Sequence, residues 1–291
     1  MITRQRFLIL IGCLAIAGLV GLFFLPREPR FQGRRLSSWL EDYGQGQQKN
    51  QQVNEAVRQI GTESLPWLLR MLKSKDSTLK LKVVNAVTKL GFKRIRFIPA
   101  EEWRKRAAWA VMSLGEKAKP ALPDLVNLFG NTQTVVWATA AVSGLGWDAV
   151  PVLCGQMTNP DDQVRSIVSS AILKLCLQPG AKDHRVEVIP LLLRNLSDAK
   201  YNIRSDAAGA LGAIAESSTA VPSLMVNLRD TNVYVCAMTA QALGRFGTNA
   251  AAAVPTLLEL SKNQDSFLHD KALEALKQIQ PGILIDFENQ K

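Results

Sequence analysis

The chain has 291 residues, of which 47% are hydrophobic and 21% charged, which is enough apolar material to bury a sizeable core. Its formal net charge is +10, and it contains two histidines and four cysteines. These counts argue against a metal enzyme that needs many histidine ligands, and they leave the spacing of the apolar residues as the main source of information.

The N-terminal segment predicts a membrane anchor. Residues 7–25 carry no charge, and Arg4 and Arg6 precede them. A run of this length spans a bilayer, and it ends at Pro26 without the small-x-small pattern of a signal-peptide cleavage site. We therefore expect residues 1–30 to form an uncleaved single-pass anchor with a transmembrane helix at residues 7–25.

Two features of this run have alternative interpretations. Leu10-Ile11-Gly12-Cys13 looks like a lipobox that would acylate Cys13, but the apolar run continues far beyond the cysteine, which favours an unmodified side chain. Cys13, Ala17 and Gly21 form a stripe of small residues along one helix face. That stripe would let two such helices pack closely, or it would simply face lipid.

Residues 31–52 predict a capping helix followed by a polar linker. Leu36, Trp39, Leu40 and Tyr43 have the spacing of one face of a short amphipathic helix. A stack of repeats needs such a cap at its end. Residues 44–52 read GQGQQKNQQ and are predicted to be the linker.

From residue 53 onward the sequence repeats itself. An Ala, apolar, two variable, apolar pattern recurs at intervals within the roughly 20–50 residues typical of stacked repeats. Its copies begin at Ala56, Ala86, Ala110, Ala141, Ala171, Ala210, Ala242 and Ala275. Positions i, i+1 and i+4 share one helix face, so each copy predicts a helix whose alanine is buried where adjacent helices meet.

Recurring glycines, prolines and aspartates predict where the helices begin and end. A glycine that would form a left-handed cap follows the first helix at Gly61, Gly91, Gly115, Gly146 and Gly247. An apolar residue and a proline predict the first turn of a second helix at Pro66, Pro123, Pro151, Pro190, Pro222 and Pro255. Aspartates predicted to cap the next first helix are Asp76, Asp161, Asp198, Asp230 and Asp265.

With these motifs, the chain resembles the HEAT-repeat family in its short bacterial form, the phycobilisome-lyase-like repeats, and it resembles a membrane-anchored member. The resemblance implies an all-α fold: a right-handed α-solenoid of about seven to eight repeats over residues 53–291, after one N-terminal transmembrane helix. It does not fix the function, because the family includes scaffolds, lyase subunits and metal enzymes.

The sequence predicts no catalytic, cofactor or metal site. His184 is followed by Arg185, and His269 is followed by Asp270, unlike the His-Glu pairs of di-iron HEAT enzymes of the deoxyhypusine hydroxylase type. GxSxG, Walker and GxGxxG motifs are absent from the sequence.

The cysteines of the repeat region also lack the spacing of a metal site. Cys154, Cys176 and Cys236 fall in separate predicted helices without a CxxC motif, so we expect free, buried thiols. A Cys154–Cys176 disulfide would require an exported domain.

The basic residues concentrate at residues 70–106, which hold twelve Lys and Arg against Asp76, Glu101 and Glu102. Within this block, an irregular insertion at 91–101 replaces a proline-led helix. The predicted interaction surface consists of Lys93, Arg94, Arg96, Arg104, Lys105 and Arg106. It would be solvated, would face anionic lipid headgroups, or would hold an acidic partner.

These observations favour a membrane-anchored, non-enzymatic scaffold that binds a protein partner along a face of successive helices. One alternative is a lyase- or chaperone-like subunit that acts on a cofactor-bearing protein. A second is nucleic-acid binding through residues 70–106, as in the HEAT-like DNA glycosylases, although the anchor and the nearly neutral remainder argue against it.

We expect the protein in the bacterial inner membrane. Arg27, Arg30, Arg34 and Arg35 outnumber Arg4 and Arg6, which favours cytoplasmic repeats. The short basic tail before the apolar run is instead typical of a signal anchor, and residues 31–40 look like the segment that joins the anchor to the repeats in exported bacterial HEAT proteins. Together these two features favour the extracytoplasmic side.

Overall fold

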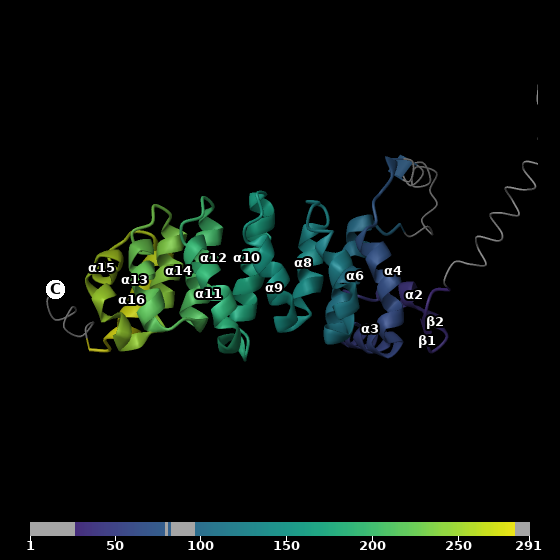
Figure 1. Cartoon of the computed structure of the whole chain (residues 1–291), viewed down its shortest axis with the longest axis horizontal. Coiled ribbons are helices and arrows are strands. Elements are labelled where there is room, and N and C mark those ends of the chain that lie inside the picture. Colours follow the sequence, from purple (N-terminus) through teal and green to yellow (C-terminus); the bar gives the residue numbers. More distant parts are fainter. Residues whose placement is uncertain (1–26, 79–80, 83–96, 283–291) are drawn as a thin grey trace, which may run out of the picture.

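The computed structural model describes residues 27–78, 81–82 and 97–282, and these form one long row of stacked helices (Figure 1). The row confirms the predicted all-α solenoid. The predicted transmembrane helix at 7–25, the Ala86 copy with Gly91, and Lys93, Arg94 and Arg96 lie outside the described residues. In the described part, every helix is too short or too polar to cross a membrane.

Each repeat contributes a first helix to a continuous ladder. The first helices are α3 (Gln47–Ile60), α6 (Ala100–Leu114), α8 (Val135–Ser143), α10 (Asp162–Cys176), α12 (Tyr201–Ile214), α14 (Val233–Gly244) and α16 (Ser266–Ile279). From α6 onward, each first helix packs against the next one along the row. The ladder therefore has the nearest-neighbour architecture of a solenoid.

The second helices pack alongside this ladder. They are α4 (Leu65–Leu72), α7 (Leu122–Val126), α9 (Val150–Gln156), α11 (Arg185–Asn195), α13 (Ser217–Asn227) and α15 (Val254–Leu260). Pro66, Pro123, Pro151 and Pro255 occupy the first turn of their helices, as predicted. Pro190 and Pro222 lie inside α11 and α13, because there the turn ahead of the proline is itself α-helical.

The motif alanines are buried where first helices meet, as predicted. Ala210, Ala242 and Ala275 are at most 1% exposed. A glycine that follows the motif allows a close approach: a Cβ placed on Gly212 would lie 2.7 Å from Cα of Ala242. α12 and α14 therefore touch backbone to backbone.

The predicted glycines end the first helices, but in a different conformation from the one expected. Gly61, Gly115, Gly146 and Gly247 have positive φ, as predicted. At Gly61 and Gly115, however, ψ is −144° and −132°, which is extended rather than left-handed helical backbone. Only glycine adopts this region readily, and it redirects the chain into a short turn. These turns are the 3-10 helices η1 (Gly61–Ser64), η2 (Gly115–Ala121), η3 (Gly146–Ala149) and η5 (Gly247–Ala253).

The N-terminal cap contains the predicted helix and an unpredicted β-ribbon. β1 (Arg30–Phe31) pairs antiparallel with β2 (Arg34–Arg35), and α2 (Leu36–Leu40) follows directly. Leu36 and Leu40 are fully buried, and Trp39 donates its indole N–H to the Phe31 carbonyl at 3.1 Å. The ribbon thus closes the end of the core beside α2.

The predicted linker is mostly helix. α3 begins at Gln47, so residues 47–52 extend the first helix of the array. Glutamine and lysine are good helix formers, and this exposed turn does not need apolar spacing to continue the helix. The polar composition at this position indicates exposure and does not indicate irregular backbone.

α3 packs directly against α6, although the Ala86 copy lies between them in sequence. Arg58 donates from Nε to the Ser113 carbonyl at 3.1 Å, and the rings of Tyr43 and Trp109 meet edge to face at 5.6 Å. In the described stack, the Ala56 copy is therefore followed by the Ala110 copy.

Candidate functional site

The predicted basic surface is only partly exposed where the structure describes it. Arg104 and Arg106 are 8% and 6% exposed. Arg104 donates to the Ser74 carbonyl at 2.7 Å, and Arg106 donates from Nε to Glu102 at 2.9 Å. Their burial corrects the expectation of an exposed basic surface at these two positions: Arg104 reaches the turn after α4, and Arg106 lies over Glu102 one turn back in α6. Lys105, which is half-buried, contacts Glu102 at 2.5 Å.

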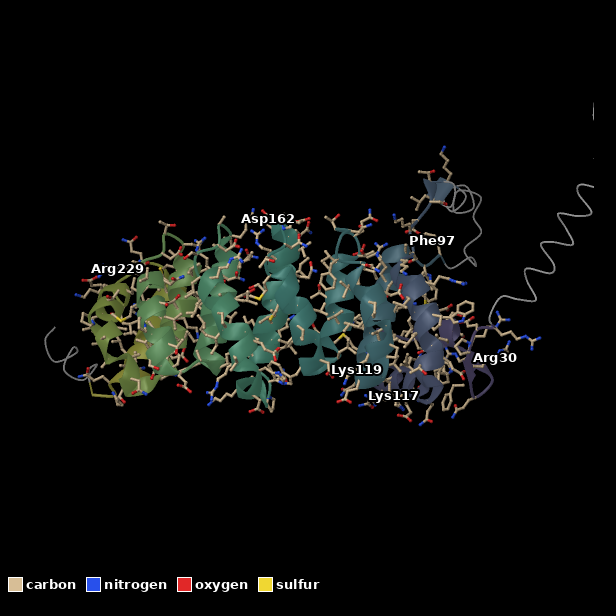
Figure 2. The ribbon with its side chains drawn as sticks, in the orientation of Figure 1. Arg30, Phe97, Lys117, Lys119, Asp162 and Arg229 are labelled. Atoms are coloured by element: carbon tan, nitrogen blue, oxygen red, sulfur yellow. The ribbon has the colours of Figure 1, made fainter. Side chains whose placement is uncertain are left out.

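The two edges of the row carry different turns. Phe97, ahead of α6, and Asp162, at the start of α10, lie on one edge in Figure 2, and Lys117 and Lys119 after α6 lie on the other. We call the first one the leading edge, defined by the turns that precede the first helices. The turns of the leading edge are tied to one another by side chains.

Arginine–aspartate pairs join neighbouring repeats along the leading edge. Arg165 pairs with Asp198 at 3.0 Å, and Arg204 pairs with Asp230 at 2.7 Å. Arg204 also donates to the carbonyl of Asp198 at 2.9 Å. The predicted capping role holds for Asp161, whose side chain accepts from a backbone N–H at the start of its helix. Asp198 and Asp230 accept from the N–H of the residue just before α12 and α14, and each also pairs with an arginine of the preceding repeat.

Three exposed aromatic rings follow one another along the same edge. Tyr201 begins α12, and Tyr234 and Phe267 are near the starts of α14 and α16. Their residues are 50%, 44% and 40% exposed, and the ring centroids are 6.5 Å apart between Tyr201 and Tyr234 and 5.7 Å apart between Tyr234 and Phe267. We call these residues the aromatic row. The sequence analysis missed them, although an aromatic residue within four positions after the last three inter-repeat aspartates, Asp198, Asp230 and Asp265, was a detectable signal.

The aromatic row borders a hollow of about 810 Å³ that also contains carboxylates. Asp206 accepts a hydrogen bond from the Ser170 hydroxyl of α10 at 2.6 Å, and burial raises the pKa of its carboxyl group. Asp265 also lines the hollow, and it caps α16 by accepting from the Leu268 N–H at 3.0 Å. The hollow thus combines aromatic faces with acidic groups.

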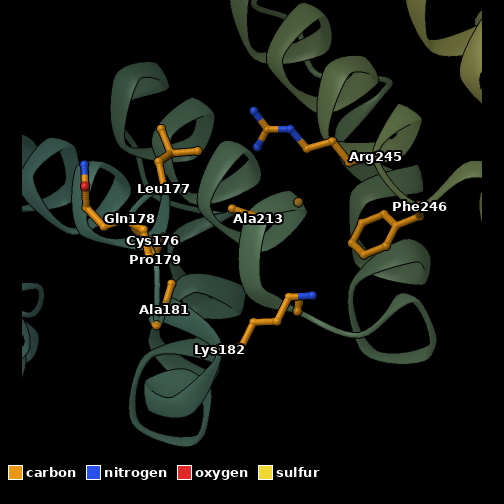
Figure 3. Close-up of a pocket in the computed structure, with 12 residues that line it drawn as sticks. Cys176, Leu177, Gln178, Pro179, Ala181, Lys182, Ala213, Arg245 and Phe246 are labelled. Carbon is orange, nitrogen blue, oxygen red and sulfur yellow. The ribbon is translucent and has the colours of Figure 1, made fainter.

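A second hollow of about 710 Å³ lies at the opposite ends of the same helices (Figure 3). Figure 3 shows Arg245 and Phe246 on one side and Lys182 on another. Arg245 donates to the Gly209 carbonyl at 3.3 Å. The ends of α10 and α12 contribute to this hollow, and carbonyl groups at helix C-termini already attract cations. The two basic side chains are therefore explained without a ligand.

The described cysteines are buried or half-buried, and His184 is stacked on an aromatic ring. Cys154, Cys176 and Cys236 are free thiols, and burial raises the pKa of Cys154 to about 11 and that of Cys176 to about 12. At neutral pH these thiols stay protonated and pack as small apolar groups. His184 stacks on Trp147 with ring centroids 4.6 Å apart. Across the described residues, no group of three metal-ligating side chains comes together.

Comparison with known proteins reveals similarity of fold. No family model matches the sequence, and no curated protein matches it. An engineered protein of known structure has a TM-score of 0.51 at 20% identity, covering 75% of this chain and 99% of that one. A computationally designed armadillo repeat protein for modular peptide recognition has a TM-score of 0.50 at 17% identity, covering 74% of this chain and all of that one.

A natural protein with the same architecture is the karyopherin Kap121p, bound to the extreme C-terminus of the protein phosphatase Cdc14p. Its TM-score is 0.51 at 17% identity, and the match covers 84% of this chain and 27% of that one. The chain therefore has an all-α helical-repeat fold of the HEAT and armadillo kind. At these identities the similarity describes the fold alone.

Proposed function

We propose that the protein is a membrane-anchored, non-catalytic scaffold that binds a protein partner along its leading edge. The observation that carries this proposal is the aromatic row, with one exposed ring on each of three successive first helices. Exposed tyrosine and phenylalanine offer a large contact area at a small cost in conformational entropy, and aromatic residues are enriched at protein interfaces. The armadillo and karyopherin structures of similar fold, which bind peptides and proteins, support a protein partner.

Rigid spacing of the rings supports the same function. The Arg204–Asp230 pair fixes the turn before α14, and the backbone contact of Gly212 with Ala242 fixes α12 against α14. A partner would therefore meet a preformed surface, which reduces the entropy that binding loses.

Site-specific photo-crosslinking in native membranes tests this proposal. A photoreactive phenylalanine analogue is placed at Phe267 and, as a matched control, at Val226 of α13, which is 72% exposed. We expect a discrete protein adduct from position 267 and none from position 226. Equal labelling at both positions, or no adduct at 267, would contradict the proposal.

The anchor is proposed from residues 7–25 of the sequence, with the repeats on the extracytoplasmic side. Full-length protein should remain in the membrane pellet after a carbonate wash. N-terminal sequencing should find residues before Phe7 in the mature protein. A mature chain that begins after Leu25 would identify a cleaved signal peptide instead.

We also propose that Lys93, Arg94 and Arg96 bind anionic lipid headgroups beside the anchor. Each basic residue near an anionic surface contributes about 1 kcal/mol. The burial of Arg104 and Arg106 leaves fewer exposed cations for nucleic acid. Combined Lys93→Glu, Arg94→Glu and Arg96→Glu substitutions should weaken protection of this segment from protease on phosphatidylserine vesicles. Unchanged protection at low salt would refute the lipid contact.

A further inference from the structure

We propose that the hollow beside the aromatic row binds an extended protein segment with arginine or lysine at alternate positions. This inference rests on the proposed scaffold function and specifies the chemistry of the partner. Among the described residues that line the hollow, Asp206 and Asp265 are the charged ones, and no lysine or arginine lines it. A cationic group is therefore the complement of this surface.

The pairing of three other carboxylates on the leading edge supports this assignment. Asp162 pairs with Lys200 at 2.7 Å, and Asp198 and Asp230 pair with Arg165 and Arg204. Within the described residues, neither Asp206 nor Asp265 forms an ion pair. These ion pairs engage Asp162, Asp198 and Asp230, whereas the two carboxylates that line the hollow have no described ion pair.

Asp206 is held in surroundings that disfavour its charge. Its described contacts supply one hydrogen bond, from Ser170, while a carboxylate can accept about four. Lys174, on α10, is the basic residue whose charge acts on it, but that lysine is exposed and does not line the hollow. A bound guanidinium or ammonium group would satisfy the remaining acceptor sites and replace the lost hydration.

The spacing of the rings matches an extended chain. Alternate side chains on one side of a strand are roughly 6.6 Å apart, since each residue advances about 3.3 Å. The centroids of the aromatic row are 6.5 Å and 5.7 Å apart. Side chains i, i+2 and i+4 of a strand can therefore each meet one ring, and a cation within about 6 Å of an aromatic face is attracted to it.

Nucleic acids and anionic lipids carry the wrong charge for this hollow. Their phosphates would approach Asp206 and Asp265 without a basic residue among the described lining to offset the repulsion. A basic protein segment is the macromolecular ligand that satisfies both the carboxylates and the rings.

The test measures binding of labelled nine-residue peptides to the full-length protein in detergent micelles by fluorescence anisotropy at low salt. One peptide alternates serine with arginine, and the control alternates serine with glutamate. We expect the arginine peptide to bind and the glutamate peptide not to bind. Asp206→Asn should weaken binding about tenfold, the loss typical of one charged hydrogen bond. Asp162→Asn, whose partner Lys200 lies outside the hollow, should bind like the wild type.

Binding should also weaken as the pH falls through the raised pKa of Asp206, because protonation removes the charge that attracts the peptide. Asp265, Tyr201 and Tyr234 are the other titratable groups that line the hollow. A Tyr234→Ala variant should lose affinity, and Tyr234→Phe should retain it, since the ring face is the binding element.

Equal binding of the arginine and glutamate peptides would overturn the inference. Wild-type affinity in a folded Asp206→Asn variant would overturn it as well. The photo-crosslink from position 267 separates the two proposals. An adduct that persists in Asp206→Asn and at high salt supports the scaffold function and refutes the basic ligand.

Discussion

At the scale of single residues, Asp206 and Asp230 show that the same type of side chain has opposite effects on stability in different surroundings, although the two residues are close in the sequence. Hydrogen bonding from Arg204 holds the pKa of the Asp230 carboxyl group below its usual range. Burial instead raises the pKa of Asp206. The lowered pKa of Asp230 means that its charge stabilises the fold, whereas the raised pKa of Asp206 means that its charge opposes folding. Carboxyl groups with a raised pKa are typical of binding sites.

Asp230→Ala should lower the free energy of unfolding by roughly 1.5–3 kcal/mol, the range for a hydrogen bond to a charged group, because it leaves the Arg204 guanidinium unpaired at 15% exposure. The depressed pKa of Asp230 contributes stability above the unfolded-state pKa and loses it as pH falls through the folded-state value. Urea unfolding of both proteins should show a difference that is largest near neutral pH and shrinks below about pH 4. A constant difference across this range would contradict the ion-pair account.

Asp206→Asn should raise the melting temperature at pH 7. The raised pKa means that the ionised group is less stable in the folded protein than in the unfolded chain, and asparagine keeps an acceptor for Ser170 without the charge. The gain should disappear as the pH falls through the folded-state pKa, where wild-type Asp206 becomes neutral. Thermal melts at pH 7 and at about pH 3 measure both effects. A lower melting temperature of the variant at pH 7 would contradict this assignment.

At the scale of elements, the contact between α12 and α14 depends on the absence of a side chain at Gly212. The same arrangement recurs one repeat later, where a Cβ on Gly244 would lie 3.1 Å from Cα of Ala275. Glycine and alanine at these positions let successive first helices approach more closely than larger residues allow. The regular ladder follows from these small residues.

Gly212→Ala should therefore destabilise the protein by about 1–3 kcal/mol, because the backbone of Ala242 cannot move away as a flexible side chain would. The matched control is Gly155→Ala in α9, where an added Cβ meets nothing within 4 Å. That substitution should stabilise the protein by about 0.5–1 kcal/mol through lower backbone entropy in the unfolded chain. Chemical denaturation measures the free energy of unfolding of both variants. An unchanged free energy in Gly212→Ala would show that α12 and α14 are too far apart for the added Cβ to touch Ala242.

At the scale of the whole molecule, the helices stack in a row, so the stability of each repeat depends on its packing against the adjacent repeats. α6 packs against α4 and α8, whereas α14 packs against α12 and α16 farther along the row, so each first helix depends mainly on its neighbours. A lesion in one repeat should therefore stay local in a way that a globular core would not permit.

Hydrogen exchange of Gly212→Ala should show this directly. Backbone amides of α12 and α14 should lose protection relative to the wild type, while those of α3 and α6 should keep it under native conditions. Mass spectrometry of peptic fragments resolves these segments. Uniform loss of protection along the chain would indicate one cooperative unit in place of a repeat array.

The sequence by itself determined the helical repeats, because alanine, leucine, glycine and proline at fixed spacing specify helix faces and helix ends through local sterics. The burial of Ala210 and Ala242 and the positive φ of Gly61 follow from that pattern. The direct packing of α3 on α6 did not follow, because a repeat motif records local propensity and not the neighbour it meets. Likewise, only the tertiary structure decided that Arg104 is buried while Tyr201, Tyr234 and Phe267 stand exposed side by side. Exposure depends on which helices cover a residue, and residues of three separate repeats become one surface only when the stack forms.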